Sequence, residues 1–252
     1  MADRIGLSGE VPTLERGDFH ALLGRLLQVA PSGADGFEAS VSQVLRLLDS
    51  PVATIDGAPL VASPGAGSGV QPWIFGFGSS RSARFAAQNG LPYAVNHHVG
   101  AGLPVDSVAE YRDSFVPRNG SAPRVAVSVH AVVAPTRRQA EVLASSYPAW
   151  FAHVVRRGFS APVPRPGAEP LALSDAERHT LDDTVRLRFV GEAADVTDRA
   201  LALASTVAAD EVLVNTVVHD SNDKLRSFEL LAQSWRTDVA AVAATSGSVV
   251  PG

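Results

Sequence analysis

Short apolar segments rich in β-branched residues alternate along this chain with segments of helical periodicity. The segments with strand character are residues 4–8, 73–77, 92–96, 124–132 and 211–216. Between them, helical spacing is clearest at residues 18–30, whose apolar residues recur every three to four positions. Apolar strands that alternate with helices predict a mostly parallel sheet covered by helices.

A closed barrel of eight strands and eight helices requires about 250 residues, and the chain has 252. The sequence contains five strand segments, however, and five strands cannot close with the tilt and shear of eight. We therefore predict an α/β fold, an incomplete or rearranged TIM-type (β/α) barrel that retains about five parallel strands. We expect one domain over residues 1–240 and a flexible C-terminal tail over residues 241–252.

The residue composition excludes several kinds of site. The chain has no cysteine, so thiol catalysis, disulfides and cysteine-ligated metals are excluded. It also lacks an HExxH pattern and a carboxylate cluster with metal spacing, so no metal site is expected. No GxSxG segment is present that would indicate Ser-His-Asp chemistry.

The charge pattern and the apolar runs limit partners and location. The 21 basic and 26 acidic residues give a net charge of −5, and the basic residues form no run. Nucleic acids and anionic membranes attract clustered positive charge, so neither is expected as a partner. Met1 is followed by no apolar signal segment, and the longest apolar runs, such as residues 125–134, are too short to cross a bilayer. We therefore expect a soluble cytoplasmic protein.

The most distinctive local motif is a glycine- and serine-rich turn within residues 73–84. An apolar strand runs into Gly76 and Gly78, and Ser79 and Ser80 follow at the start of a predicted helix. Glycine allows close approach of the backbone to a ligand, and the free N–H groups of a helix N-terminus attract an anion. The turn therefore suggests phosphate binding, and the alternative is that a serine only caps the helix.

Histidines follow two of the predicted strands. His97 and His98 come directly after one strand and are the candidate catalytic residues, although adjacent residues on a strand point to opposite faces. A hydrogen-bonded pair in a loop is the alternative interpretation. His130 lies inside a strand, as is typical of a core residue, and His219 follows the last strand beside Asp220, which also fits as a helix cap.

The segment WIFGFGSSRSARFAAQNGLPYAVNHH, residues 73–98, resembles a strand–helix–strand segment of the bacterial-luciferase-like flavin monooxygenases. That family shows the pattern W-x-x-G-S-S-x-x-S-A-x-x-A-A-x-x-G-L-P-x-A-x-x-H-H. Further matches follow in the same order at residues 111–117, 127–144, 190–191 and 210–232. The resemblance covers residues 3–236.

The resemblance implies a TIM barrel that binds reduced FMN, supplied by a separate flavin reductase, at the carboxyl ends of its strands. In the family, the serine-bearing turn holds the FMN phosphate, which corresponds here to Gly78, Ser79, Ser80 and Ser82. The flavin reacts with O₂ and oxidises the substrate, while the protein supplies orientation and a water-poor pocket.

Three features depart from the family pattern. Residues 4–7 resemble the family's fourth strand, so about three strands that precede it in relatives are missing from this sequence. Val11 stands at the usual position of an arginine, with Glu10 beside it, which weakens the expected FMN site. The serine turn also has one more residue than the family pattern.

These departures leave two functions open. One is a luciferase-like monooxygenase that uses reduced FMN and is degenerate at its N-terminus. The other is a non-catalytic flavin- or ligand-binding protein, or a partner subunit related to the family. Because unpaired edges of a parallel sheet require covering, we expect a homodimer or a heteromer with a larger relative, unless the helix at residues 18–30 covers the gap.

Overall fold

A computed structural model describes residues 34–53, 57, 59–76, 80–98, 104–118, 120–157, 162–169 and 172–246. The predicted strand at residues 4–8, the predicted helix at residues 18–30, and Val11 lie outside the described residues.

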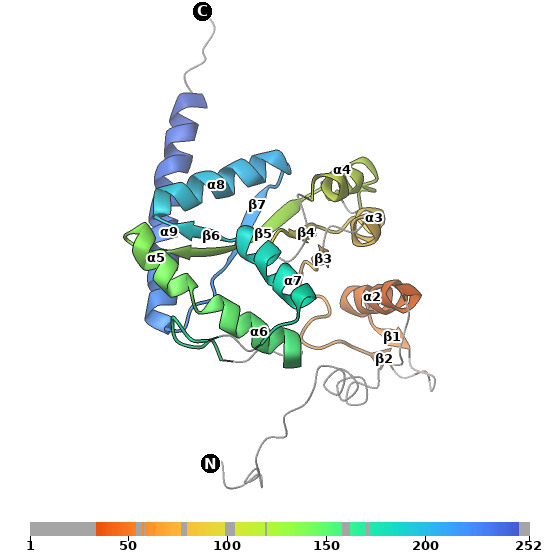
Figure 1. The fold of residues 1–252 in the computed structure, drawn as a ribbon. Helices are drawn as coiled ribbons and strands as arrows, with labels where there is room; N and C mark the ends of the chain where they lie inside the picture. The colour runs from red at the N-terminus through yellow and green to blue at the C-terminus, as the bar shows by residue number, and fades with distance from the viewer. Residues whose placement is uncertain are drawn as a thin grey trace, which may run out of the picture.

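The centre of the molecule is a parallel sheet (Figure 1). Its strands run in the order β3 (Ile74–Gly76), β4 (Tyr93–Asn96), β5 (Val125–Val133) and β6 (Phe189–Gly191), and β7 (Glu211–Asn215) also pairs with β5. Within the described residues the strands form an open sheet and not a closed barrel. The prediction of an incomplete α/β barrel is therefore confirmed.

Four of the predicted strands are present as β3, β4, β5 and β7, and all their pairings are parallel. The strand β6 was not predicted; it pairs in parallel with the last three residues of β5. A strand of three residues is too short to show the two-residue period by which strands are recognised.

Eight helices and a small hairpin complete the described part of the chain. The hairpin pairs β1 (Val52–Ala53) with β2 (Pro59–Leu60). The helices are α2 (Ala34–Asp49), α3 (Ser80–Gln88), α4 (Val105–Asp113), α5 (Arg137–Ala144), α6 (Tyr147–Arg157), α7 (Asp175–Arg186), α8 (Ala193–Thr206) and α9 (Ser221–Ser246). Two helices, α5 and α6, follow β5, and α9 extends to Ser246, within the segment expected to be a tail.

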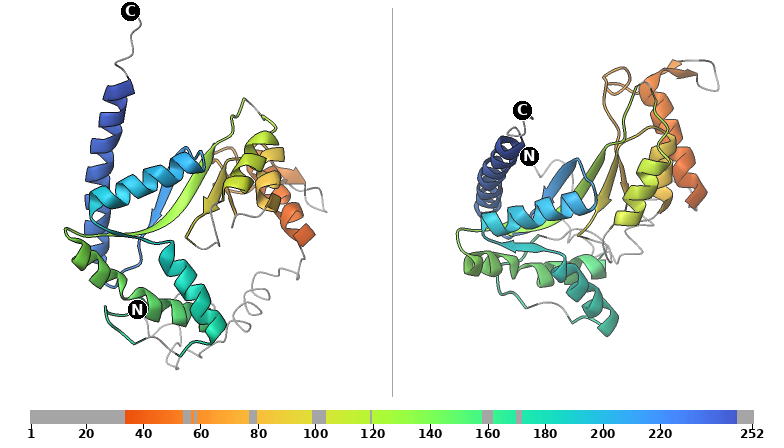
Figure 2. Two further views of the ribbon diagram at one scale, coloured as in Figure 1. Left: turned by 45° about the horizontal axis from the view of Figure 1, so that its top comes forward. Right: turned by 90° about the horizontal axis from the view of Figure 1, so that it is seen from above.

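Alternation along β5 gives the sheet two different faces. Val125, Val127 and Val129 belong to the main hydrophobic core, together with apolar residues of α3, α4, α8 and α9. Figures 1 and 2 show α3 and α4 beside β3 and β4, and α8 and α9 beside β5. We call this side the helix face. The opposite side, the inner face, carries the intervening residues of each strand, which are Phe75, Ala94, Asn96, Ala126, Ser128, His130, Val132, Val190, Glu211, Leu213 and Asn215.

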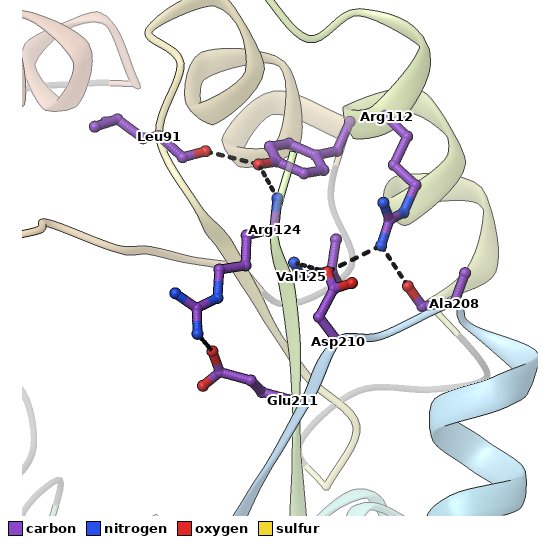
Figure 3. A network of polar contacts seen from close by, with 8 residues as sticks. Leu91, Arg112, Arg124, Val125, Ala208, Asp210 and Glu211 are labelled. Atoms are coloured by element: carbon purple, nitrogen blue, oxygen red, sulfur yellow. Dashed lines mark hydrogen bonds and ion pairs between the residues drawn. The ribbon is translucent and has the colours of Figure 1, made fainter. Parts of the chain in front are cut away.

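Polar side chains join the amino ends of the strands (Figure 3). The Asp210 carboxylate accepts a hydrogen bond of 2.7 Å from the Val125 backbone N–H and one of 3.1 Å from Arg112, and Arg112 also donates to the Ala208 carbonyl. Arg124 forms an ion pair with Glu211. These contacts fix β5 to β7 and α4 at the end of the sheet remote from the predicted site.

Candidate functional site

The predicted serine turn follows β3 at the carboxyl edge of the sheet. Gly78 and Ser79 lie outside the described residues, and Ser80 is the first residue of α3. Ser82 lies in the first turn of α3, with its hydroxyl 3.0 Å from the point that a Cβ atom on Gly76 would occupy. The Ser82 side chain is therefore directed back onto the end of β3.

Gly76 is required by close packing at the end of β3. A Cβ atom there would lie 2.5 Å from the Tyr93 hydroxyl oxygen and 2.9 Å from a carbon of the same ring. Tyr93 is fully buried, so its ring cannot move aside freely. The glycine therefore allows the end of β3 to pack closely against Tyr93 of the adjacent strand β4.

His97 and His98 lie on opposite sides of the sheet. His97 is 7% exposed, and its ring centroid lies 5.9 Å from that of Phe189. Its buried Nδ1 atom has no hydrogen-bond partner in the part of the chain that the structure describes. Burial, followed by the neighbouring His98, lowers the pKa of His97. His98 instead contacts Ser128 and His130 on the inner face.

A short hydrogen-bonded chain holds His98. The Ser128 hydroxyl donates to Asn96 Oδ1 at 2.6 Å. Nδ1 of His98 lies 3.1 Å from that hydroxyl oxygen and 3.3 Å from the Ser128 carbonyl oxygen. Burial lowers the pKa of His98, and the contact with the Ser128 carbonyl opposes this shift. The imidazole is therefore neutral at neutral pH and fixed in orientation.

His98, Ser128 and His130 form a polar row on the inner face, and His130 is the most deeply buried of the three. It is 1% exposed, and its Nε2 atom accepts a hydrogen bond of 3.2 Å from the Val217 backbone N–H. Burial, then the Arg188 guanidinium and then His98, lower the pKa of His130 to about 3. A neutral ring is what this contact requires, because a protonated Nε2 could not accept it.

An aromatic residue and an arginine cover His130. The ring of Tyr147, in α6, lies 5.0 Å from that of His130, and the Arg188 guanidinium lies 4.2 Å from the centre of the Tyr147 ring. Arg188 is 6% exposed and donates to the Ala144 carbonyl. No described residue is a hydrogen-bond partner of its buried Nε atom. Burial lowers the pKa of Arg188 to about 10, so this residue keeps its charge.

Sequence reasoning missed most of this row. Ser128 and His130 are polar residues two positions apart in a strand of valine and alanine, and a period of two places both on one face. That spacing could have predicted that the two side chains lie together on one face of the sheet. No local signal identified Tyr147 or Arg188, which reach the row from helix α6 and from the residue before β6.

At the amino end of the inner face lies an open hollow of about 380 Å³. Trp73, Phe75, Arg124, Ala126, Glu211 and Leu213 line it. Phe75 is 52% exposed and Leu213 is 37% exposed. The described residues thus leave apolar side chains of the inner face uncovered.

The described residues contain no group of three or more histidine, cysteine or acidic side chains placed to hold a metal ion. No helix among them has the length and apolar character that a membrane span requires.

Several curated proteins are similar in sequence, whereas no family model matches the chain. A Bacillus subtilis protein, the uncharacterized YvbT, is 31% identical over 176 residues, which are 69% of this chain and 52% of that protein. An Escherichia coli luciferase-like monooxygenase is 28% identical over 198 residues, which are 78% of this chain and 58% of that protein. The chain thus spans little more than half the length of these relatives.

Solved structures share the fold. The crystal structure of apo-MsnO8 is 25% identical, with a TM-score of 0.67 over 86% of this chain and 64% of that chain. The monooxygenase RslO1 from Streptomyces bottropensis has a TM-score of 0.59 over 86% of this chain and 65% of that chain, at 15% identity. The sequence matches and the shared α/β fold together show that this chain belongs to the luciferase-like monooxygenase family.

Proposed function

We propose that this chain binds reduced FMN at the carboxyl edge of its sheet and acts as a luciferase-like monooxygenase, with a separate reductase that supplies the reduced flavin. The observation that carries this proposal is the meeting of two features at one edge: the N-terminus of α3 follows β3, and His98 follows the adjacent strand β4. In parallel α/β proteins, ligands bind outside the carboxyl ends of the strands.

The described residues at this edge fit a phosphate group. The first turn of α3 contains no acidic residue, and the Glu38 carboxylate of α2 is paired with Arg81 of α3 at 2.9 Å. Free backbone N–H groups at a helix start favour an anion. We assign the phosphate to the backbone N–H groups of this helix start, in keeping with the expectation from the sequence that Gly78, Ser79, Ser80 and Ser82 bind it.

The inner face provides the rest of the proposed site. Reduced FMN, when bound, supplies the electrons that activate O₂. His98 contributes a neutral imidazole of fixed orientation. His130, Tyr147 and Arg188 are buried and pack together, and they exclude water from the interior side of the proposed site. Exclusion of water strengthens the polar contacts that orient a bound molecule.

Titration with FMN tests the proposal. We expect wild-type protein to quench FMN fluorescence on binding, and Ser80→Asp to bind at least about tenfold more weakly, because a carboxylate would face the phosphate. Ser221→Asp is the matched control, since Ser221 is the first residue of α9 and an acidic residue stabilises both helix starts equally. Equal FMN affinities of Ser80→Asp and Ser221→Asp would show that the phosphate does not bind at this turn.

A second candidate is a non-catalytic partner subunit. The exposed Phe75 and Leu213 of the inner-face hollow favour it, because apolar side chains of this kind mark a surface that another chain covers. Light scattering distinguishes the cases: a homodimer or a complex with a larger relative supports the subunit, and a stable monomer of 26.3 kDa argues against it.

A further inference from the structure

The protonated nitrogen of His98 can be assigned from its neighbours. Nδ1 lies 3.3 Å from the Ser128 carbonyl oxygen, which can only accept a hydrogen bond. The hydroxyl oxygen of the same residue lies 3.1 Å from Nδ1, and its own proton is donated to Asn96 Oδ1. Nδ1 therefore carries the proton in the neutral ring, and Nε2 is an acceptor with a free lone pair.

That lone pair has no partner in the described part of the chain. His98 is partly exposed, and no hydrogen bond joins its Nε2 atom to any described residue. The neighbouring histidines differ in this respect. Nε2 of His130 already accepts from the Val217 N–H, and His97 is buried on the helix face against Phe189.

We propose that Asn96 and Ser128 are positioning residues that hold His98 in this tautomer, and that Nε2 of His98 accepts a hydrogen bond from an O–H or N–H group of the molecule bound at the carboxyl edge. The donor belongs either to the flavin ring or to a substrate that carries a hydroxyl or N–H group. A deprotonated oxyanion is disfavoured there, because its lone pairs would oppose that of Nε2. The identity of the bound molecule rests on the proposed function; the tautomer does not.

Nitrogen NMR of the ¹⁵N-labelled histidines tests the tautomer without any ligand. We expect His98 to carry its proton on Nδ1 at pH 7.5. His219 serves as an internal reference, because its Nδ1 lies 2.7 Å from the Val163 carbonyl oxygen on an exposed surface. Ser128→Ala removes one of the two acceptors, so the Nε2-protonated form of His98 should increase while that of His219 stays unchanged. A proton on Nε2 of His98 in the wild type would overturn the proposal.

Two substitutions of His98 then test the acceptor role by FMN titration. His98→Gln keeps an acceptor oxygen, whereas His98→Leu has none. If the donor belongs to the flavin, His98→Leu should bind FMN about tenfold more weakly and His98→Gln should bind it nearly as well as the wild type. If both bind FMN as the wild type does, the donor belongs to the substrate.

Failure of the proposed function and failure of the acceptor role of His98 give different results. A wild type that does not bind FMN would refute the proposed function and leave the NMR result intact. His98→Gln binding as weakly as His98→Leu would refute the acceptor role, even with the flavin bound. Circular dichroism of each variant establishes that the fold is retained.

Discussion

The two ends of the parallel sheet differ in their polar contacts. At the amino end, Asp210, Arg112 and Tyr111 are bonded to backbone groups of neighbouring elements (Figure 3). At the carboxyl end, neither Nε2 of His98 nor the buried Nδ1 of His97 has a hydrogen-bond partner among the described residues. The contacts at the amino end stabilise the fold, whereas the carboxyl end is where we propose that the ligand binds.

The largest expected effect of a single substitution is at Gly76, the tightest point of the carboxyl end. In Gly76→Ala the new methyl group would meet the Tyr93 ring at 2.5–2.9 Å, and we expect a loss of about 3 kcal/mol in the free energy of unfolding. The melting temperature should fall by roughly 6–12 °C. Tyr93→Phe in the same chain should restore part of the loss, because it removes the nearest atom. Gly36→Ala, inside helix α2, is the control and should not destabilise.

The next largest effect is expected at the amino end. Asp210→Ala removes the acceptor of the buried Val125 N–H and the partner of Arg112, so urea denaturation should show a loss of about 2 kcal/mol. Asp182→Ala, on the exposed side of α7, should have little effect. Unchanged FMN binding in Asp210→Ala would support the separation of the two ends, and lost binding in a folded variant would contradict it.

Acid should act on the carboxyl end through His130. Its pKa is lowered from 6.5 to about 3, so below pH 6.5 the unfolded chain binds a proton that the folded chain does not. The free energy of unfolding should therefore fall by about 1.4 kcal/mol per pH unit between pH 6.5 and the lowered pKa. His130→Gln does not titrate and can still accept from Val217, so its stability should decline less steeply. Parallel pH profiles of the two proteins would contradict this account.

The smallest effect is expected from Tyr111→Phe. The Tyr111 hydroxyl donates to the Leu91 carbonyl at 2.9 Å and accepts from the Arg124 N–H at 3.1 Å. Both partners lie near solvent, so loss of the hydroxyl should cost about 1 kcal/mol. Chemical denaturation measures this difference, and stability equal to that of the wild type would mean that water replaces the hydroxyl.

Local patterns in the sequence were sufficient for much of the sheet. β5 is nine residues of valine, alanine, serine and histidine, and a run of this length and composition has few alternatives. The start of α7 is another local feature, because the Ser174 hydroxyl accepts a hydrogen bond of 3.3 Å from the Glu177 N–H only three residues later. Such features depend on neighbours in the sequence, and these are visible in the sequence itself.

The parts that escaped prediction depend on residues distant in the sequence. The pairing of β6 with β5 joins Ala131 to Phe189. Arg188 contacts the Tyr147 ring although the helices α6 and α7 separate the two residues along the sequence. The tautomer of His98 likewise depends on a serine 30 residues away. A periodic pattern carries no information about such contacts, because it records only which face a residue occupies.

The position of β5 between β4 and β7 has a consequence for the order of folding. β3 pairs with β4 across 19 residues (74 to 93) and β4 with β5 across 32 (93 to 125), whereas β5 pairs with β7 across 85 (126 to 211). Closing the longer loop costs roughly 0.9 kcal/mol more entropy than closing the 32-residue loop, and distant contacts form slowly. We therefore expect β3, β4 and β5 to assemble first and β7 to dock last. In pulse-labelled refolding, protection of the β5 amides that bond to β4 should precede protection of the β7 amides.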